Sequence, residues 1–329
     1  MIKLLLIFFS GFLLDLIFGD PRYGFHPIRI IGKGIAGQEY LLRKYGLDGR
    51  AGGILLVSGI LILTVLLYLL ATYLFMYIHP AAAWLFDLYI FYSCLALKDL
   101  FYHIRPVISS LKGDNLPDAR KAIAMVVGRD VDSLDREGIV RAAIETMAEN
   151  FVDGFLTPLF WFITGGLSAG LFGLYPVPTA LCMMLSARVA STLDSMVGYK
   201  NPEYLKFGRA GAGFDDIMNF VPARLSVIIL FLGALFSRSH ALVGLKTALR
   251  DRLKHDSPNA GHSESFMAGA LGVRLGGPAI YRDKIKHKPW LGEEFPDPSI
   301  EHIIVTERVI MVSSWVSVII AGGLTAAVC

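Results

Sequence analysis

Two glutamates at helical spacing provide the clearest chemical signal in the sequence. Glu145 and Glu149 are four positions apart, so a helix would place both carboxylates on one face. Arg141 lies one turn before them, and a long apolar run follows them. Two unpaired carboxylates at this spacing cost stability, whereas Mg²⁺ or another cation between them makes a binding site. The alternative is a solvated helix face on which Arg141 pairs with Glu145.

An acid and an imidazole follow the first apolar segment. Asp20 and His26 flank a short stretch in which Gly19 permits a tight exit from a helix and Pro21 fixes the backbone. A carboxylate and an imidazole this close in sequence can take up or release a proton near neutral pH. The alternative is that Asp20 is a simple helix-stop or turn residue.

A third polar stretch combines glycines with carboxylates. The glycines between positions 208 and 213 would let a phosphate approach the backbone, but their spacing matches neither the P-loop nor the dinucleotide fingerprint. Asp215 and Asn219 are four positions apart and offer two oxygen ligands on one helical face, a pattern that suits Mg²⁺ plus phosphate. The structural alternative is an ion pair of Asp216 with Arg209 or Arg224.

The fourth polar stretch begins with strong turn chemistry at Ser257-Pro258-Asn259-Ala260-Gly261. Glu264 then opens a segment of small residues that runs to Gly272 and is able to lie close against a helix or a flat ligand. Such segments are usually packing surfaces, but the polar residues at the front of this one favour a site.

The composition places the chain in a membrane. Apolar residues make up 54% of the sequence and the mean hydropathy is positive. The segments 54–78 and 309–328 contain no charged residue and are long enough for a hydrocarbon core of roughly 30 Å. The N-terminal segment carries Asp15 and no small-residue cleavage site, so we expect a retained helix rather than a signal peptide. The expected spans are 1–19, 54–78, 81–97, 155–187 as a broken helix or hairpin, and 309–328, with 225–243 left open.

These spans predict an all-α, polytopic integral membrane protein with broken or re-entrant helices and one domain covering residues 1–329. Arginines and lysines between the first two spans outnumber the acids, so the positive-inside rule puts residues 20–50 in the cytoplasm. We therefore expect a protein of the inner or plasma membrane whose site lies at the cytoplasmic face.

Charge and cysteine content exclude two other classes of protein. The net charge of +3 is spread over the loops and forms no basic stripe, which argues against nucleic-acid binding. The three cysteines lie in apolar segments and have neither metal-ligand spacing nor an even number for disulfides. We interpret them as buried apolar residues.

Taken together, the polar stretches resemble the integral-membrane adenosylcobinamide-phosphate synthases (cobinamide synthases) of cobalamin biosynthesis. The motifs follow one another from residue 15 to about 281, and as a set they are highly specific. In that family an aromatic residue and a proline commonly follow the last motif, where this chain has His262 and Ser263. The matching motifs include Gly19-Asp20-Pro21, Gly128-Arg129-Asp130, Ala148-Glu149-Asn150, Asp194-Ser195-Met196-Val197-Gly198-Tyr199-Lys200-Asn201 and Ser257-Pro258-Asn259-Ala260-Gly261.

The resemblance implies an amide-forming ligase. Such an enzyme joins the propionate carboxylate of adenosylcobyric acid to the amine of (R)-1-amino-2-propanol or its O-phosphate, with ATP and Mg²⁺. Amide formation from a free carboxylate is uphill in water, so the carboxylate must be activated by phosphoryl or nucleotidyl transfer. The implied partners are the corrinoid, the aminopropanol, the lipid bilayer and other membrane-associated enzymes of cobalamin assembly.

Clustered carboxylates are the expected ligands of Mg²⁺ on the nucleotide, because Mg²⁺ on phosphate requires oxygen ligands. Basic side chains would neutralise phosphate or carboxylate charge, and an imidazole or carboxylate would take the proton from the attacking amine. The metal candidates are Glu145, Glu149, Asp215 and Asp216.

The remaining candidates fall into two groups. The catalytic candidates are Asp20, His26, Glu145, Glu149 and Lys200. The candidates for binding substrate or nucleotide are Arg129, Asn150, Asp194, Tyr199, Asn201, Asn219, Arg224, Ser257, Asn259 and Glu264.

Two alternatives from other classes stay open. A membrane prenyl or phosphoalcohol transferase also uses paired acids with Mg²⁺, and Asp215-Asp216-Ile217-Met218-Asn219 is close to an Asp-Asp-x-x-Asp diphosphate site. No second motif of that kind is present in the sequence. A non-catalytic membrane sensor or transporter is the other alternative, although a transporter concentrates polar residues in mid-span and this chain has them mostly at span ends.

Overall fold

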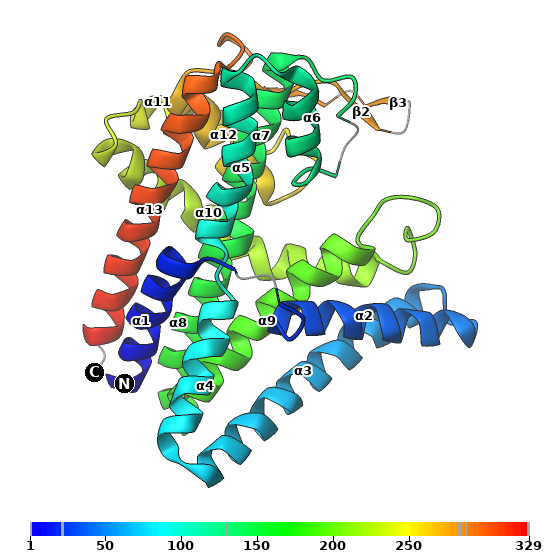
Figure 1. Ribbon diagram of the computed structural model, residues 1–329, viewed down its shortest axis with the longest axis vertical. Coiled ribbons are helices and arrows are strands. Elements are labelled where there is room, and N and C mark those ends of the chain that lie inside the picture. The colour runs from blue at the N-terminus through cyan, green and yellow to red at the C-terminus, as the bar shows by residue number, and fades with distance from the viewer. Residues whose placement is uncertain (1, 21–22, 129–130, 282–283, 287, 328–329) are drawn as a thin grey trace. The chain divides into compact units, whose positions relative to one another are not determined.

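The chain is an all-α polytopic membrane protein, and helices make up nearly all of its regular structure (Figure 1). The computed structural model describes residues 2–20, 23–128, 131–281, 284–286 and 288–327. Within them, six helical segments are long and apolar enough to cross a membrane. These segments are Arg50–Ile78, Pro80–Lys112, Arg136–Phe172, Pro176–Val197, Arg209–Phe236 and Ile300–Ala327.

The chain forms two compact units, of which the first contains residues 1–96, 157–219 and 320–329. The second contains residues 97–156 and 220–319. Two long helices, α10 (Arg209–Phe236) and α13 (Ile300–Ala327), contribute residues to both units. The other helices of the first unit are α1 (Ile2–Phe18), α2 (Pro27–Lys44), α3 (Arg50–Ile78), α4 (Pro80–Ser93), α8 (Thr157–Ala169), the 3₁₀ turn η2 (Gly170–Phe172) and α9 (Pro176–Val197).

An aromatic cluster holds three helices of the first unit together. Phe8 of α1, Phe91 of α4 and Phe162 of α8 are all buried, and the Phe91 and Phe162 rings lie 4.6 Å apart at their centroids. Gly11 allows this packing, because a Cβ atom there would lie 2.1 Å from the Phe91 ring. Such edge-to-face contacts add to the apolar burial that joins α1, α4 and α8.

The apolar run at 155–187 contains a helical hairpin. Helix α8 ends at Ala169, and α9 begins at Pro176 after Gly173 has adopted a left-handed conformation with φ of 64°. The two helices pack closely, since a Cβ atom at Gly165 would meet Ala180 of α9 at 2.9 Å.

The hairpin of α3 and α4 carries an acid inside the apolar region. Asp87 of α4 is 7% exposed, and its Oδ1 atom accepts hydrogen bonds from Tyr68 at 2.8 Å and Thr72 at 3.3 Å, both on α3. Polar groups at this depth require partners within the protein. Much of the opposite face of α3 exposes large apolar side chains, as expected for contact with lipid.

The second unit contains shorter helices and two small antiparallel sheets. Strand β1 (Leu275–Gly276) pairs with β4 (Trp290–Leu291), and β2 (Ala279–Tyr281) pairs with β3 (Lys284–Lys286). Its helices are α5 (Leu97–Lys112), α6 (Leu116–Ala124), α7 (Arg136–Phe151), the π-helical turn η1 (Val152–Leu156), α11 (Ala241–Asp251) and α12 (Ala260–Leu271).

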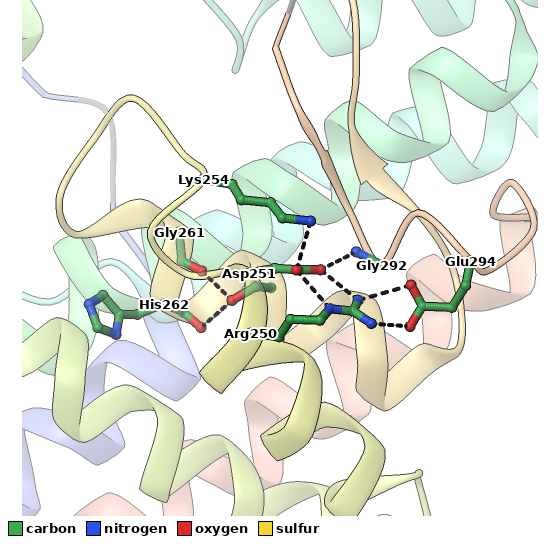
Figure 2. Close-up of polar contacts among 8 residues, drawn as sticks. Arg250, Asp251, Lys254, Gly261, His262, Gly292 and Glu294 are labelled. Carbon is green, nitrogen blue, oxygen red and sulfur yellow. Dashed lines mark hydrogen bonds and ion pairs between the residues drawn. The ribbon is translucent and has the colours of Figure 1, made fainter.

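An ion-pair network fixes the end of α11 in the second unit (Figure 2). Asp251 is fully buried and accepts hydrogen bonds from Arg250 at 2.7 Å, from Lys254 at 2.8 Å and from the Gly292 N–H at 2.9 Å. Both terminal nitrogens of Arg250 also donate hydrogen bonds to the carboxylate of Glu294. The network joins the end of α11 to the loop after β4 and holds the start of the segment that leads into α12.

Candidate functional site

The predicted site residues are divided between the two units. The first unit holds Asp20, His26, Asp194, Tyr199, Lys200, Asn201, Asp215, Asp216 and Asn219. The second holds Glu145, Glu149, Asn150, Arg224, Ser257, Asn259 and Glu264. Arg129 lies outside the described residues.

In the first unit, the side chains of Asp20 and His26 lie next to each other. His26 Nε2 lies 2.8 Å from Asp20 Oδ1, and the imidazole is 2% exposed, whereas the Asp20 side chain is partly exposed. His26 directly precedes Pro27 at the start of α2, so the start of this helix fixes the position of the ring. The pair therefore has a buried imidazole and an accessible carboxylate, as proton transfer would require.

A second group in the first unit combines two acids with a lysine. Asp194 near the end of α9 lies close enough to Asp216 of α10 and to Lys200 for their charges to interact. Gly198 makes room for the acid, since a Cβ atom there would lie 2.0 Å from Asp194 Oδ1. The positive charge of Lys200 acts on Asp216.

Asn219 positions the neighbouring acid. Its Nδ2 donates a hydrogen bond to Asp215 at 3.0 Å, and its Oδ1 accepts one from Thr157 at 2.5 Å. The side chain is 2% exposed. Asn219 thus holds Asp215 in place through its amide nitrogen, so the two side chains predicted to share one helical face are hydrogen-bonded to each other.

The loop after α9 gives a different role to each of its polar residues. Tyr199 and Lys200 are exposed. Asn201 uses its side-chain oxygen to accept the Tyr204 N–H at 2.9 Å, as a turn residue does. Two of the three are therefore accessible for binding, and the third shapes the loop.

In the second unit, Glu145 is held by the backbone of a strand. The Gly276 N–H of β1 donates to Glu145 Oε1 at 2.7 Å. Arg141 contacts Asp297, which also accepts hydrogen bonds from Arg274. Glu149 and Asn150 are exposed at the end of α7.

A histidine that was not among the predicted site residues joins this group. His255 Nδ1 accepts the Ser257 N–H at 3.0 Å, and His255 Nε2 lies 3.8 Å from Glu264 Oε1. Burial and the positive charge of Lys288 lower the pKa of His255, and they outweigh the negative charge of Glu145, which raises it. The ring is therefore neutral at pH 7. The feature of the sequence that could have identified His255 as a site residue is its position two residues before Ser257-Pro258-Asn259.

The turn at Ser257 leads directly into α12 and bonds the backbone at its start. Ser257 Oγ accepts the N–H groups of Asn259 at 3.3 Å and Ala260 at 3.2 Å. Arg224 of α10 donates to Asn259 Oδ1 at 3.4 Å and stacks over the Phe220 ring. Glu264 is 4% exposed and Arg224 is partly buried, so this end of α12 gathers polar groups of both charges.

The four metal candidates are not brought together as one set of ligands within either unit. Glu145 and Glu149 belong to the second unit, whereas Asp215 and Asp216 belong to the first. Among the residues that the structure describes, no group of three or more His, Cys, Asp or Glu side chains has the geometry to hold a metal ion. Mg²⁺ on a nucleotide needs only one or two carboxylates besides the phosphates, so the paired acids remain suitable donors.

Comparison with known proteins gives a consistent family. The model of the family described as CobD/Cbib protein matches residues 8–310. A protein of Desulfotalea psychrophila is 35% identical over 315 residues, which cover 95% of this chain and 94% of the relative. Relatives from Pelobacter propionicus (40% over 285 residues, 85% of this chain and 83% of the relative) and Klebsiella pneumoniae (37% over 316 residues, 94% of each) have the same description, "Cobalamin biosynthesis protein CobD". No solved structure matches the chain.

Proposed function

Because the chain belongs to the CobD/Cbib protein family, we propose that it forms the amide between the propionate carboxylate of a corrinoid and the amine of 1-amino-2-propanol or its O-phosphate, at the expense of ATP. Family membership gives the chain a role in cobalamin biosynthesis. The observation that carries the proposal is the match over residues 8–310, which contains every candidate site residue.

The acids of the first unit support binding of the nucleotide. Asp194 and Asp216 are two carboxylates beside the ammonium of Lys200, which is a suitable donor set for Mg²⁺ and a phosphate. Bound there, Mg²⁺ would neutralise the negative charge that develops on the phosphates.

The chain supplies two arrangements able to accept the proton of the amine. Asp20 with His26 is one, and Glu264 beside the neutral ring of His255 is the other. The amine must lose a proton as it attacks the activated carboxyl group, and a carboxylate or imidazole performs this step near neutral pH. Glu145, held by the Gly276 N–H, would stabilise positive charge on the amine before attack.

The first test is condensation by detergent-purified protein. Adenosylcobyric acid is incubated with 1-amino-2-propanol or its O-phosphate, with and without ATP and Mg²⁺, and the corrinoid is analysed by mass spectrometry. We expect a mass gain that equals the amine minus water and that requires ATP. Release of ADP would indicate an acyl phosphate, and release of AMP an acyl adenylate.

Folded protein that gives no amide with either amine contradicts the proposal. In that case turnover of a labelled isoprenoid diphosphate would favour a membrane transferase. Corrinoid flux across vesicles without ATP hydrolysis would favour a transporter.

A further inference from the structure

A buried histidine at the start of α12 has a ring nitrogen without a hydrogen-bond partner. His262 is 4% exposed, and across the described part of the chain its buried Nε2 atom accepts or donates no hydrogen bond. Buried polar atoms are nearly always paired, so an unpaired one requires an explanation such as a bound group. Figure 2 shows the ring pointing away from the Asp251 network, so that network does not satisfy it.

Two arginines lie near this ring. Arg224 of α10 and Arg252, which directly follows α11, both interact with His262 through their charges, and burial together with these charges lowers its pKa to about 4. The two guanidinium groups also repel each other. A neutral imidazole that can donate a hydrogen bond therefore lies beside two positive charges.

Neither arginine is neutralised by an acid among the described residues. Arg224 donates to the Phe220 carbonyl at 2.5 Å and to Asn259 Oδ1 at 3.4 Å, and Arg252 donates to the Leu249 carbonyl at 2.6 Å. These partners are neutral oxygens. Since both arginines are partly buried, an anion between them would relieve a real electrostatic cost.

The backbone adds to the positive potential. The twelve-residue helix α12 begins at Ala260, and the partial positive charge of its N-terminus favours a negative group there. Gly261 brings Arg252 close to this end, because a Cβ atom at position 261 would lie 2.3 Å from the Arg252 carbonyl oxygen. The helix start, both arginines and the imidazole thus converge in the second unit.

We infer that Arg224, Arg252, His262 and the start of α12 form a binding site for a phosphomonoester dianion. The two guanidinium groups balance its double charge, and the imidazole donates one hydrogen bond to a phosphate oxygen. Arg252 and His262 were not among the residues predicted from the sequence. The inference rests on the proposed function only for the carrier of the phosphate, which is either the phosphorylated amino alcohol or the nucleotide.

The test measures binding rather than catalysis. Thermal stabilisation of the detergent-purified protein is titrated with inorganic phosphate, the O-phosphate of 1-amino-2-propanol, the unphosphorylated amino alcohol and ATP without Mg²⁺. We expect the phosphorylated amino alcohol to stabilise the protein and the unphosphorylated one to have little effect. Stabilisation by ATP with none by the phosphorylated amino alcohol would assign the site to the nucleotide instead.

Two variants tie binding to the named groups. Arg252→Gln removes one charge-assisted contact and should weaken binding by about ten- to a hundredfold, and His262→Phe keeps the ring size but removes the donor. Arg252→Lys should restore part of the affinity. Arg238→Gln, at an exposed position of the same unit, is the matched control and should bind as the wild type does.

Unchanged affinity in both Arg252→Gln and His262→Phe, with melting temperatures near that of the wild type, overturns the site. No stabilisation of the wild type by any phosphate also overturns it. The wild-type protein could also bind phosphate through Arg252 and yet form no amide. That result would keep the phosphate site and refute the proposed reaction, so failure of the site and failure of the reaction are distinguishable.

Discussion

Asn219 links two side chains that the fold must hold in place. Its amide bridges Thr157 and Asp215 in a buried position. We expect Asn219→Ala to lower stability by about 1–3 kcal/mol, because it removes one buried hydrogen bond from each partner. Asn219→Asp would instead set a second carboxylate against Asp215 and should be more damaging at pH 8 than at pH 5. Melting temperatures of both variants and of the wild type at the two pH values measure this.

Glu149 tests the role of the α7 acids. It is exposed, so Glu149→Gln should leave folding and membrane insertion intact while it abolishes ATP-dependent condensation. Glu137→Gln, an exposed substitution in the first turn of the same helix, should retain activity. The condensation assay with mass spectrometry decides the matter, and near-normal turnover of Glu149→Gln would remove Glu149 from the mechanism.

His262 should make stability depend on pH. Its pKa is about 4 in the folded protein, against about 6.5 in an unfolded chain. Between these values the unfolded state binds a proton that the folded state does not, so stability falls as the pH is lowered from about 6.5 to about 4, by at most ~3 kcal/mol.

The measurement compares His262→Phe with the wild type in phosphate-free buffer. As the pH falls from about 6.5 to about 4, the melting temperature of the wild type should fall more than that of His262→Phe. A constant difference between pH 7 and pH 4 would mean that the buried ring is not the group that titrates.

At the scale of elements, the Asp251 network joins the end of α11 to the loop after β4. Burial alone would raise the pKa of Asp251, but hydrogen bonds from Arg250, Lys254 and the Gly292 N–H outweigh it and hold the pKa well below its ordinary value. Its stabilising contribution is therefore complete above about pH 4 and is lost as the pH falls below that.

We expect Asp251→Asn to cost about 2–3 kcal/mol, because it weakens charge-assisted bonds at a fully buried position. Glu294→Gln should cost less than ~1 kcal/mol, since the Glu294 side chain is 46% exposed. Melting temperatures at pH 7 compare the two. Equal losses would show that the network acts as one unit rather than through its buried member.

Helix α10 shows which features of an element can be predicted from the sequence and which cannot. The sequence left a crossing at 225–243 open, whereas the helix runs from Arg209 to Phe236 and includes Pro222. Pro222 removes the N–H that would bond the Met218 carbonyl, and the Trp161 indole N–H donates to that carbonyl at 2.9 Å instead. Such a replacement depends on a residue far away in sequence, which hydropathy cannot identify.

For the whole molecule, composition was sufficient to predict an all-α membrane protein, and ordered motifs were sufficient to predict its family. Local spacing also predicted which acids share a helix face. Contacts between residues distant in sequence could not be predicted, as those of Arg141 with Asp297 and of Glu145 with Gly276 show. Spacing specifies neighbours on one helix, whereas contacts between elements follow from tertiary packing.

The orientation of the chain in the membrane remains a prediction. Lysine and arginine outnumber the acids in residues 20–50, so the positive-inside rule places this segment in the cytoplasm. In a variant without its natural cysteines, Asp48→Cys, at an exposed position between α2 and α3, should react with a membrane-impermeant thiol reagent only from the cytoplasmic side. Reaction from the opposite side alone would reverse this assignment.

The hydrogen bonds of Asp87 have a consequence for biosynthesis. An aspartate at the centre of a helix opposes insertion from the translocon by about 2.5–3.5 kcal/mol. Both of its donors, Tyr68 and Thr72, lie on α3, which leaves the ribosome first and is joined to α4 at His79 and Pro80. We therefore expect α3 and α4 to insert together as a hairpin, because Tyr68 and Thr72 then satisfy Asp87 within the membrane.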